Sequence, residues 1–287
     1  NTFEMKTAIH FGDNALDRLK EIPYKRVLII TDPFVVQSKM INLITAPLNS
    51  AGIEYDIFHD VVPDAPVDKI AEGVKKFLEY QPEAVVAVGG GSPMDCAKAI
   101  GARIARPRKS IRQLQGVFKV LRAIPLFIAV PTTAGTGSET TLAAVITDAD
   151  THHKYAINDF NLIPDYAVLE PSVTYGLPPQ LTATTGMDAL THAIEAYIGR
   201  STTKQTRKAA IEAIQLIFQY LPVAYKNGKN RTARKEMLRA SYLAGTAFTK
   251  SYVGYGHAVA HSLGGCYGIP HGLANSVLLP VILEAYG

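Results

Sequence analysis

The chain has 287 residues, of which 47% are hydrophobic and 19% are charged, and its formal net charge is +4. A chain of this length buries a sizeable core and divides into about two domains, and its composition excludes a disordered, collagen-like or coiled-coil protein. No apolar run approaches the ~20 residues of a membrane-spanning helix, so we expect no membrane association.

Cysteine content and charge distribution indicate the compartment and exclude some partners. The two cysteines, Cys96 and Cys266, are too few for a disulfide framework and indicate a reducing compartment. The segment that starts at Asn1 has no basic-then-apolar leader, so we expect a cytoplasmic protein. Basic residues cluster at 103–112 and 226–239 without aromatic interleaving, which favours solvated helix faces and no nucleic-acid partner.

The first half of the chain alternates between apolar runs and helical patterns. Short runs rich in Val and Ile, typical of parallel strands buried on both faces, occupy Arg26–Asp32, Tyr55–Phe58, Ala84–Gly89 and Pro125–Thr132. Between them, Val67–Tyr80 repeats apolar residues on one helical face. This alternation predicts an α/β domain with a parallel sheet and right-handed crossovers.

After about Pro178 the strand pattern ends. Helical patterns separated by Gly, Pro and Asn occupy Asp188–Gly199, Gln205–Tyr225, Arg234–Lys250 and Gly256–Leu263. We therefore predict two domains, an α/β domain over residues 1–178 and an all-helical domain over residues 179–287.

A glycine-rich segment, GGGSPMD at 89–95, follows one predicted strand and opens a helix. Glycines permit close backbone approach, and free N–H groups at a helix N-terminus bind anions such as phosphate. We expect Ser92 to cap the helix, Pro93 to take its first position and Asp95 to complete a capping box. A well-capped tight turn is the plainer alternative, but three consecutive glycines after such a strand favour phosphate binding. The segment is not GxGxxG, so it does not assign the nucleotide.

A second loop, PTTAGTGSE at 131–139, also follows a predicted strand and combines four hydroxyls with two glycines. Alone it is compatible with an ordinary loop. Two such loops at neighbouring strand ends favour a ligand crevice, because open parallel sheets bind ligands outside their carboxyl edge.

Histidines and one aspartate are spaced as on helix faces in the second half. Asp188 and His192 lie at i and i+4, His257 and His261 repeat that spacing, and His271 follows a Gly/Pro-rich break. A carboxylate and several imidazoles from three helices can hold Fe(II) or Zn(II). The alternatives are a chance spacing and an Asp188 that complements a helix dipole.

Four segments together resemble a known family. GGGSPMDCAK, PTTAGTGSE, GMDALTHAIEAY and GHAVAHSLGGCYGIPHGLAN resemble, in order and approximate separation, signatures of the iron-containing (group III) alcohol dehydrogenase family. The resemblance covers essentially the whole chain. It implies a dinucleotide-binding α/β domain, a helical domain in a dehydroquinate synthase-like architecture, and catalysis in the cleft between them. Family chains continue with further helices, so we expect a chain truncated at its C-terminus.

The resemblance also implies roles for individual residues. The metal ligands would be Asp188, His192, His257 and His271, and His261 would take part in proton transfer near the nicotinamide and substrate. Cofactor-binding positions would be Gly90, Gly91, Ser92, Asp95, Thr132, Thr133, Thr136 and Lys154.

Asp32 bears on the choice of cofactor. It ends the first predicted strand, where its carboxylate would bond the adenosine ribose and repel a 2′-phosphate, so we expect NAD rather than NADP. A turn residue at a strand end is the plainer interpretation of Asp32.

The predicted activity is metal-dependent, NAD(H)-linked hydride transfer between small primary alcohols and aldehydes. One divalent metal, Fe(II) in preference to Zn(II), would polarise the substrate oxygen. We expect a homodimer or larger homo-oligomer, in the cytoplasm or inside a protein-shelled compartment.

Three alternatives stay open: a glycerol-type polyol dehydrogenase, a dehydroquinate synthase-like lyase and an inactive structural relative. The glycerol type generally lacks the second member of the Asp-x-x-x-His pair, whereas His192 is present here. A lyase would need a Lys/Arg cluster beside the metal residues, where only Lys250 stands.

Overall fold

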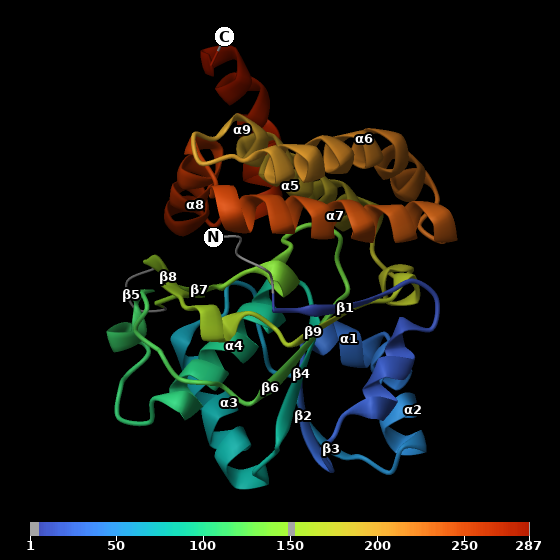
Figure 1. Ribbon diagram of the computed structural model, residues 1–287, viewed down its shortest axis with the longest axis vertical. Helices are drawn as coiled ribbons and strands as arrows, with labels where there is room; N and C mark the ends of the chain where they lie inside the picture. Colours follow the sequence, from blue (N-terminus) through green and yellow to red (C-terminus); the bar gives the residue numbers. More distant parts are fainter. Residues whose placement is uncertain (1–5, 149–152, 287) are drawn as a thin grey trace. The chain divides into compact units, whose positions relative to one another are not determined.

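The computed structural model describes residues 6–148 and 153–286, and its contacts divide the chain into two units (Figure 1). The first unit comprises Asn1–Thr132 and Ser138–Val173. The second comprises Thr133–Gly137 and Thr174–Gly287, so a short loop within the first half of the chain already belongs to the second unit.

A six-stranded parallel sheet in the order β1-β9-β6-β4-β2-β3 forms the centre of the first unit. Its strands are β1 (Ala8–Phe11), β2 (Arg26–Ile30), β3 (Glu54–Phe58), β4 (Ala84–Gly89), β6 (Leu126–Pro131) and β9 (Tyr166–Leu169). Every residue of β4 is buried, as its continuous apolar sequence requires. The predicted α/β fold with a parallel sheet is confirmed.

Alternate side chains of these strands enter two separate cores. Leu28 and Val85 pack on one face with α3 (Val67–Tyr80) and α4 (Gly91–Ala105). On the other face, Val27 and Val86 pack with residues of the 3₁₀ helix η1 (Ala15–Glu21), α1 (Pro33–Gln37) and α2 (Ile41–Ser50). Because both faces are covered, the carboxyl edge of the sheet is the place where loops can bind a ligand.

A small second sheet, in the order β5-β8-β7, also belongs to the first unit. It contains β5 (Gly116–Val117), β7 (Ala143–Thr147) and β8 (Lys154–Asn158), and β7 pairs with β8 in antiparallel register. The sequence prediction identified neither this sheet nor β1 and β9. In β7 and β8, partly exposed residues alternate with buried ones, so these strands lack the continuous apolar run that marked the others.

The second unit is helical, as predicted. Its helices are α5 (Pro179–Ile198), α6 (Lys204–Lys226), α7 (Arg231–Ser251), α8 (Tyr255–Tyr267) and α9 (His271–Tyr286). α5 begins earlier than expected, because Pro179 occupies a first-turn position that suits proline. Alanines from α5, α6 and α7, such as Ala193, Ala213 and Ala244, let these helices approach closely. None of the helices described is long and apolar enough to span a membrane.

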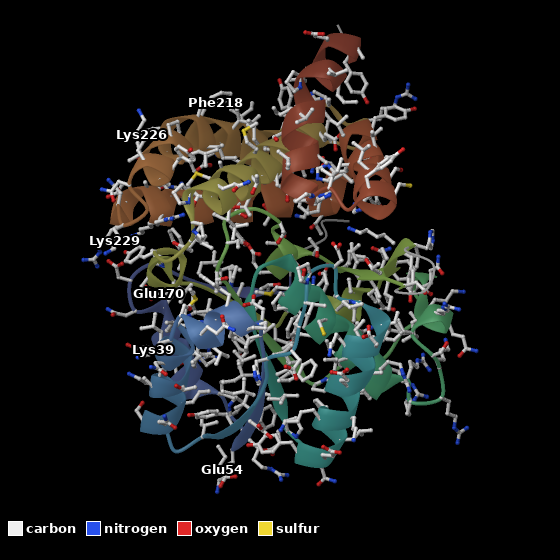
Figure 2. All side chains as sticks on the ribbon, turned by 180° about the vertical axis from the view of Figure 1, so that it is seen from behind. Lys39, Glu54, Glu170, Phe218, Lys226 and Lys229 are labelled. Atoms are coloured by element: carbon white, nitrogen blue, oxygen red, sulfur yellow. The ribbon has the colours of Figure 1, made fainter. Side chains whose placement is uncertain are left out.

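The basic cluster at 226–239 is a solvated face with one exception. Lys226 and Lys229 are exposed and project outward at the end of α6 and in the turn after it (Figure 2). Arg234 is instead buried, and its guanidinium donates to the carbonyls of Gly228 and Leu177 and to Thr182 Oγ1. The interpretation as a solvated face is therefore wrong for Arg234, which ties the start of α5 to α7.

Candidate active site

Three helices bring the predicted metal ligands together inside the helical unit. Asp188 and His192 lie one turn apart on α5, His257 lies on α8, and His271 is the first residue of α9. The candidate ligand atoms of Asp188, His192 and His257 all lie within 4.8 Å of one another, and all three residues are buried. His271 Nε2 lies 3.5 Å from Asp188 Oδ1. One carboxylate and three imidazoles thus converge from residues that are far apart in the sequence.

Asn275, one turn after His271, occupies the point on which these groups converge. Its Nδ2 donates to Asp188 Oδ1 at 2.7 Å and lies 3.2 Å from Nε2 of both His257 and His271. The buried Oδ1 of Asn275 and Nδ1 of His192 have no hydrogen-bond partner among the described residues. A carboxylate oxygen and two imidazole nitrogens therefore converge on one amide nitrogen, and this set of O and N atoms fits a divalent cation of the Fe(II) or Zn(II) type.

Burial and mutual charge set the protonation of this cluster. Burial alone would raise the pKa of Asp188, but His192, His271 and His257 hold that pKa well below its usual range. Burial lowers the pKa of His192 to about 3, so its imidazole is neutral, the form that binds metals. Burial also acts to lower the pKa of His257, but its bonds to Asp188 and Glu195 raise it to about 9 in the metal-free protein.

His261 lies at the edge of the cluster. It follows His257 by one turn of α8, is half-buried, and its ring centroid lies 4.8 Å from that of His271. On the opposite side, Phe248 of α7 stacks on His192 at 4.2 Å. The cluster therefore has an apolar wall at His192 and a titratable, partly exposed group at His261.

In the first unit, α4 begins directly after the glycine-rich end of β4. Gly90 is its N-cap and makes no side-chain cap bond, so the first-turn N–H groups are not engaged by a capping side chain. The predicted cap at Ser92 is wrong, because the helix already begins at Gly91 and Ser92 and Pro93 lie inside its first turn. Ser92 Oγ instead accepts a bond from the Asp64 N–H at 3.0 Å. An uncapped helix start of this kind suits an anionic ligand.

Asp95 does not complete a capping box, which corrects the second part of that prediction. Its carboxylate accepts bonds from Ser138 Oγ at 2.9 Å and from the Val145 N–H at 3.1 Å. One turn later, the fully buried Lys98 ammonium donates to the carbonyl oxygens of Ser138, Thr141 and Ala143. Burial raises the pKa of Asp95 and lowers that of Lys98 to about 8. Asp95 and Lys98 thus fix the end of the second loop and the segment after it against α4.

The second loop is divided between the two units. Thr132 belongs to the first unit, where its N–H donates to the Gly89 carbonyl at 2.9 Å. Thr133 and Thr136 belong to the helical unit. There, a Cβ on Gly135 would lie 2.7 Å from Thr185 Cβ, and one on Gly137 would lie 2.9 Å from Gly245 Cα. Both glycines are therefore needed for the loop to approach α5 and α7.

Two further predicted cofactor residues lie beside the glycine-rich segment. Asp32 caps α1, because its Oδ1 accepts a bond from the Val35 N–H at 3.0 Å. Its Oδ2 lies 3.3 Å from the place where a Cβ on Gly89 would stand, so the carboxylate lies next to the end of β4. Lys154 Nζ pairs with Asp64 Oδ1 at 2.8 Å, and Asp64 also bonds Ser92.

Lys98, Glu195 and Asn275 were not predicted from the sequence as site residues. Each had a usable signal in its spacing from a residue that was singled out: Lys98 lies at i+3 from Asp95, Glu195 at i+3 from His192, and Asn275 at i+4 from His271. One carboxylate and three histidines, of which only His271 is partly exposed, thus lie beside polar partners in an arrangement that fits a metal ion.

Comparison with known proteins identifies the class of protein. Residues 6–171 match the family model described as iron-containing alcohol dehydrogenase, and residues 182–287 match the C-terminal model of the same family. The chain is 43% identical over 280 residues to alcohol dehydrogenase 4 of Saccharomyces cerevisiae (strain YJM789), covering 96% of this chain and 73% of that one. The chain belongs to the iron-containing alcohol dehydrogenase family, as its resemblance predicted, and is an oxidoreductase.

Solved structures agree with this assignment. A crystal structure of 1,3-propanediol oxidoreductase superimposes with a TM-score of 0.95 at 39% identity, covering 99% of this chain and 76% of that chain. Sulfoacetaldehyde reductase from Bifidobacterium kashiwanohense, solved in complex with NAD+, gives a TM-score of 0.89 at 31% identity with the same coverage.

Proposed function

We propose that this enzyme interconverts small primary alcohols and aldehydes by transferring hydride to and from NAD. The observation that carries the proposal is the convergence of Asp188, His192 and His257 in a member of the iron-containing alcohol dehydrogenase family. Residues 1–178 would bind the dinucleotide and residues 179–287 would bind the metal.

Asp188, His192, His257 and His271 would hold the metal, Fe(II) in preference to Zn(II). When bound, such an ion supplies Lewis acidity that polarises the substrate oxygen and favours the alkoxide form of an alcohol. Fe(II) is preferred because of the family to which the chain belongs, since an Asp/His donor set accepts either ion.

His261 would move the hydroxyl proton between the substrate and solvent. Its partial exposure and its contact with the His271 ring support that role, and the ordinary pKa of imidazole, about 6.5, suits proton transfer near neutral pH.

The glycine-rich start of α4 would bind the cofactor pyrophosphate. Gly90, Gly91 and Ser92 would offer backbone N–H groups there, and the lack of a side-chain cap supports this role. Thr132, Thr133, Thr136 and Lys154 would line the rest of the cofactor site, with Asp95 holding the second loop in position through Ser138.

Asp32 would select NAD over NADP, because its carboxylate beside the end of β4 would repel a 2′-phosphate. Asp32→Asn keeps an N-cap oxygen for α1 but removes the charge. We expect the ratio of kcat/KM for NADP to that for NAD to rise about tenfold, a change of ~1.4 kcal/mol. An unchanged ratio would leave Asp32 as a helix cap only.

The first test of the proposed function is metal content per chain after anaerobic Fe(II) loading and desalting, with His257→Ala as the control. About one ion in the parent and little in the variant would establish the site, and Zn(II) loading would compare the two metals. A panel of primary alcohols, 1,3-propanediol and glycerol with NAD would then identify the substrate. Metal binding without any turnover would favour the inactive relative, and preference for glycerol would favour the polyol dehydrogenase.

The expected homodimer or larger homo-oligomer and the cytoplasmic location, with a protein-shelled compartment as the alternative, remain predictions. Light scattering of the purified chain and fractionation of the cells that make it would test them.

A further inference from the structure

Glu195 is a buried carboxylate that the predicted metal and cofactor sites do not use. It lies on α5 at i+3 from His192 and i+7 from Asp188, so all three side chains share one face of that helix. Its side chain is only 1% exposed. A carboxylate buried to this degree needs partners, and the identity of those partners indicates what it does.

Both carboxylate oxygens of Glu195 form hydrogen bonds with the start of α8, to its N-cap residue and to two residues of its first turn. Oε2 lies 2.6 Å from Nδ1 of His257 and accepts the Gly254 N–H at 2.9 Å. Oε1 accepts the Gly256 N–H at 2.7 Å. With Nδ1 directed at Glu195, the Nε2 atom of His257 faces Asp188, 3.7 Å from Oδ1.

The start of α8 is shaped to admit this carboxylate. Gly254, its N-cap, makes no side-chain cap bond. Glu195, from another helix, accepts the Gly256 N–H and so provides the acceptor that a capping side chain would offer. A Cβ would lie 3.0 Å from Glu195 Oε1 if built on Gly254 and 2.8 Å if built on Gly256. Side chains at these two positions would therefore force the carboxylate away from its partners.

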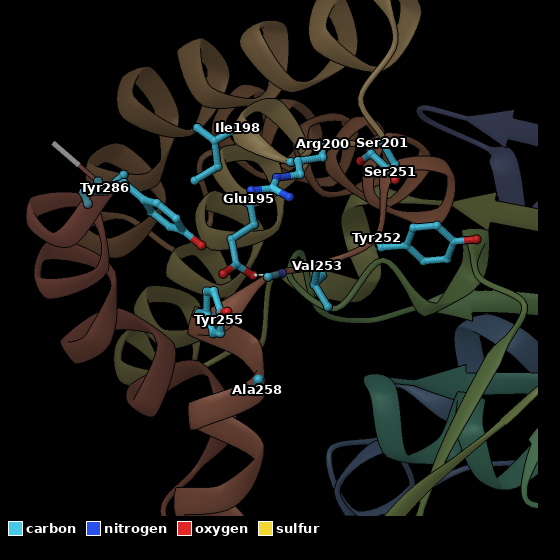
Figure 3. Close-up of a pocket in the computed structure, with 13 residues that line it drawn as sticks. Glu195, Ile198, Arg200, Ser201, Ser251, Tyr252, Val253, Tyr255, Ala258 and Tyr286 are labelled. Atoms are coloured by element: carbon cyan, nitrogen blue, oxygen red, sulfur yellow. Dashed lines mark hydrogen bonds between the residues drawn. The ribbon is translucent and has the colours of Figure 1, made fainter.

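The position of Glu195 beside a cavity offers a second interpretation, that it binds a ligand there. Glu195 borders a cavity of about 1020 Å³ whose other lining residues include Arg200, Tyr255 and Tyr286 (Figure 3). Figure 3 also shows its bond to Gly254 as a dashed line. The side chain is almost fully buried and both carboxylate oxygens are already bonded to residues of α8 or its N-cap, which favours a role toward His257 over ligand binding in the cavity.

We propose that Glu195 is a positioning residue for the metal ligand His257. It holds the proton of His257 on Nδ1, which leaves the lone pair of Nε2 for the ion, and it fixes the start of α8 against α5, which carries Asp188 and His192. A carboxylate that accepts the second N–H of a ligating imidazole orients the ring and increases its basicity, and its loss costs about 10–100-fold in metal affinity. The proposal rests on the proposed metal site.

The decisive variant is Glu195→Gln, which keeps the shape of the side chain. The matched control is Glu212→Gln, which removes a carboxylate of the same unit that pairs with Arg239 on the surface. Zn(II) affinity of the full chain is measured by competition with a chelator, and the Co(II) form is compared by its visible absorption. We expect Glu195→Gln to weaken Zn(II) binding about 10–100-fold and to change the Co(II) spectrum. Glu212→Gln is expected to match the parent.

A second measurement examines the imidazole directly. Two-bond proton–nitrogen NMR spectra of the Zn(II) form are expected to show His257 protonated on Nδ1 in the parent and a lost or mixed assignment in Glu195→Gln. In the metal-free parent, the Nδ1 proton is expected downfield and protected from exchange. It should be absent from His257→Ala and shifted in Glu195→Gln.

Gly256→Ala is an independent route to the same displacement, because its methyl group would collide with Oε1. It is expected to weaken Zn(II) binding as well, whereas Gly176→Ala, where a Cβ meets nothing within 4 Å, should not. If Glu195→Gln fails to fold, Gly256→Ala and the parent spectra decide the question. Parent-like Zn(II) affinity and an Nδ1 proton unchanged in either folded variant would overturn the proposal. Absence of Zn(II) binding by the parent would instead contradict the proposed metal site, and the metal-free Nδ1 signal would still test the bond to Glu195.

Discussion

The two units of this enzyme prepare their sites with different parts of the chain. In the first unit the candidate pyrophosphate site is made by backbone: a glycine-rich strand end and the start of α4, which no side chain caps. In the helical unit the candidate metal site is made by side chains that three helices direct to one point. A backbone site is therefore sensitive to an added Cβ, and a side-chain site is sensitive to lost ligand atoms.

The largest expected effect is the loss of one ligand atom from the helical unit. Asp188→Asn removes the negative charge around which His257, His271 and Asn275 are arranged. Because loss of an outer-shell partner already costs about 10–100-fold, we expect metal affinity to fall by more than about 100-fold. Metal analysis and titration with NAD are the measurements, and NAD affinity should stay within about twofold. A variant that kept full metal and full turnover would show that Asp188 is no ligand.

The corresponding change in the first unit is Gly89→Ala. Gly89 has φ +150, and a Cβ there would lie 2.5 Å from Pro93 Cγ and 3.3 Å from Asp32 Oδ2. Backbone strain and overpacking together predict a loss of about 3–5 kcal/mol in the free energy of unfolding, together with weaker NAD binding. Gly52→Ala is the control, since Gly52 has φ +65 but open space around it and should lose only about 1–2 kcal/mol. Equal losses in urea denaturation would show that crowding at Gly89 is unimportant.

The elements that could be predicted from the sequence are those marked by a local pattern of apolar residues. α3 and β4 have the predicted bounds, because an apolar repeat on one face defines a helix and a continuous apolar run defines a central strand. β7 and β8 were missed because their half-buried residues acquire strand structure by pairing with each other. The start of α4 was misplaced for a related reason: the partners of Ser92 and Asp95 are Asp64, Ser138 and Val145, far along the chain.

The candidate metal site was likewise predicted in part: its ligands were identified from the sequence, but the residues that orient them were not. The spacing of Asp188 and His192 on one helix was visible in the sequence, and the structure brings His257 to them. The bond between His257 and Glu195 joins residues 62 positions apart, and no local pattern specifies it. Spacing thus identifies side chains that share a helix face, whereas the partners that orient them depend on how the helices pack.

A smaller expected effect is a dependence of stability on pH that arises from the buried carboxyl group of Glu139 in the first unit. Burial raises the pKa of Glu139 to about 7, with Lys98 opposing. Between its ordinary pKa and pH 7 the folded state holds a proton that the unfolded chain has lost, so stability falls as pH rises through this range. Between pH 5 and pH 7.5 we expect the free energy of unfolding of the parent to fall by about 2–3 kcal/mol more than that of Glu139→Gln. Urea denaturation at each pH measures this difference. Parallel pH profiles would show that Glu139 is ionised in the folded protein.

The smallest expected effect is the loss of stability when the capped start of α6 loses its cap, in contrast to the uncapped start of α4. α6 begins with a capping box in which Thr203 Oγ1 accepts the Thr206 N–H and Thr206 Oγ1 accepts the Thr203 N–H, whereas α4 begins without a side-chain cap. Thr203→Ala should lower the free energy of unfolding by about 1 kcal/mol and leave NAD and metal affinities unchanged. Thr203→Ser, which keeps a capping hydroxyl, should retain the stability of the parent.

Adding a capping side chain at the start of α4 is the converse test of this difference between the two helix starts. Gly90→Ser places a capping residue at the N-cap of α4, where Gly90 has φ −83, a value that serine adopts readily. If this helix start is kept uncapped for the cofactor, the variant should gain stability or stay neutral and bind NAD more weakly, because the serine oxygen competes with phosphate for the same N–H groups. Unchanged NAD affinity together with higher stability would show that the uncapped start of α4 does not contribute to cofactor binding.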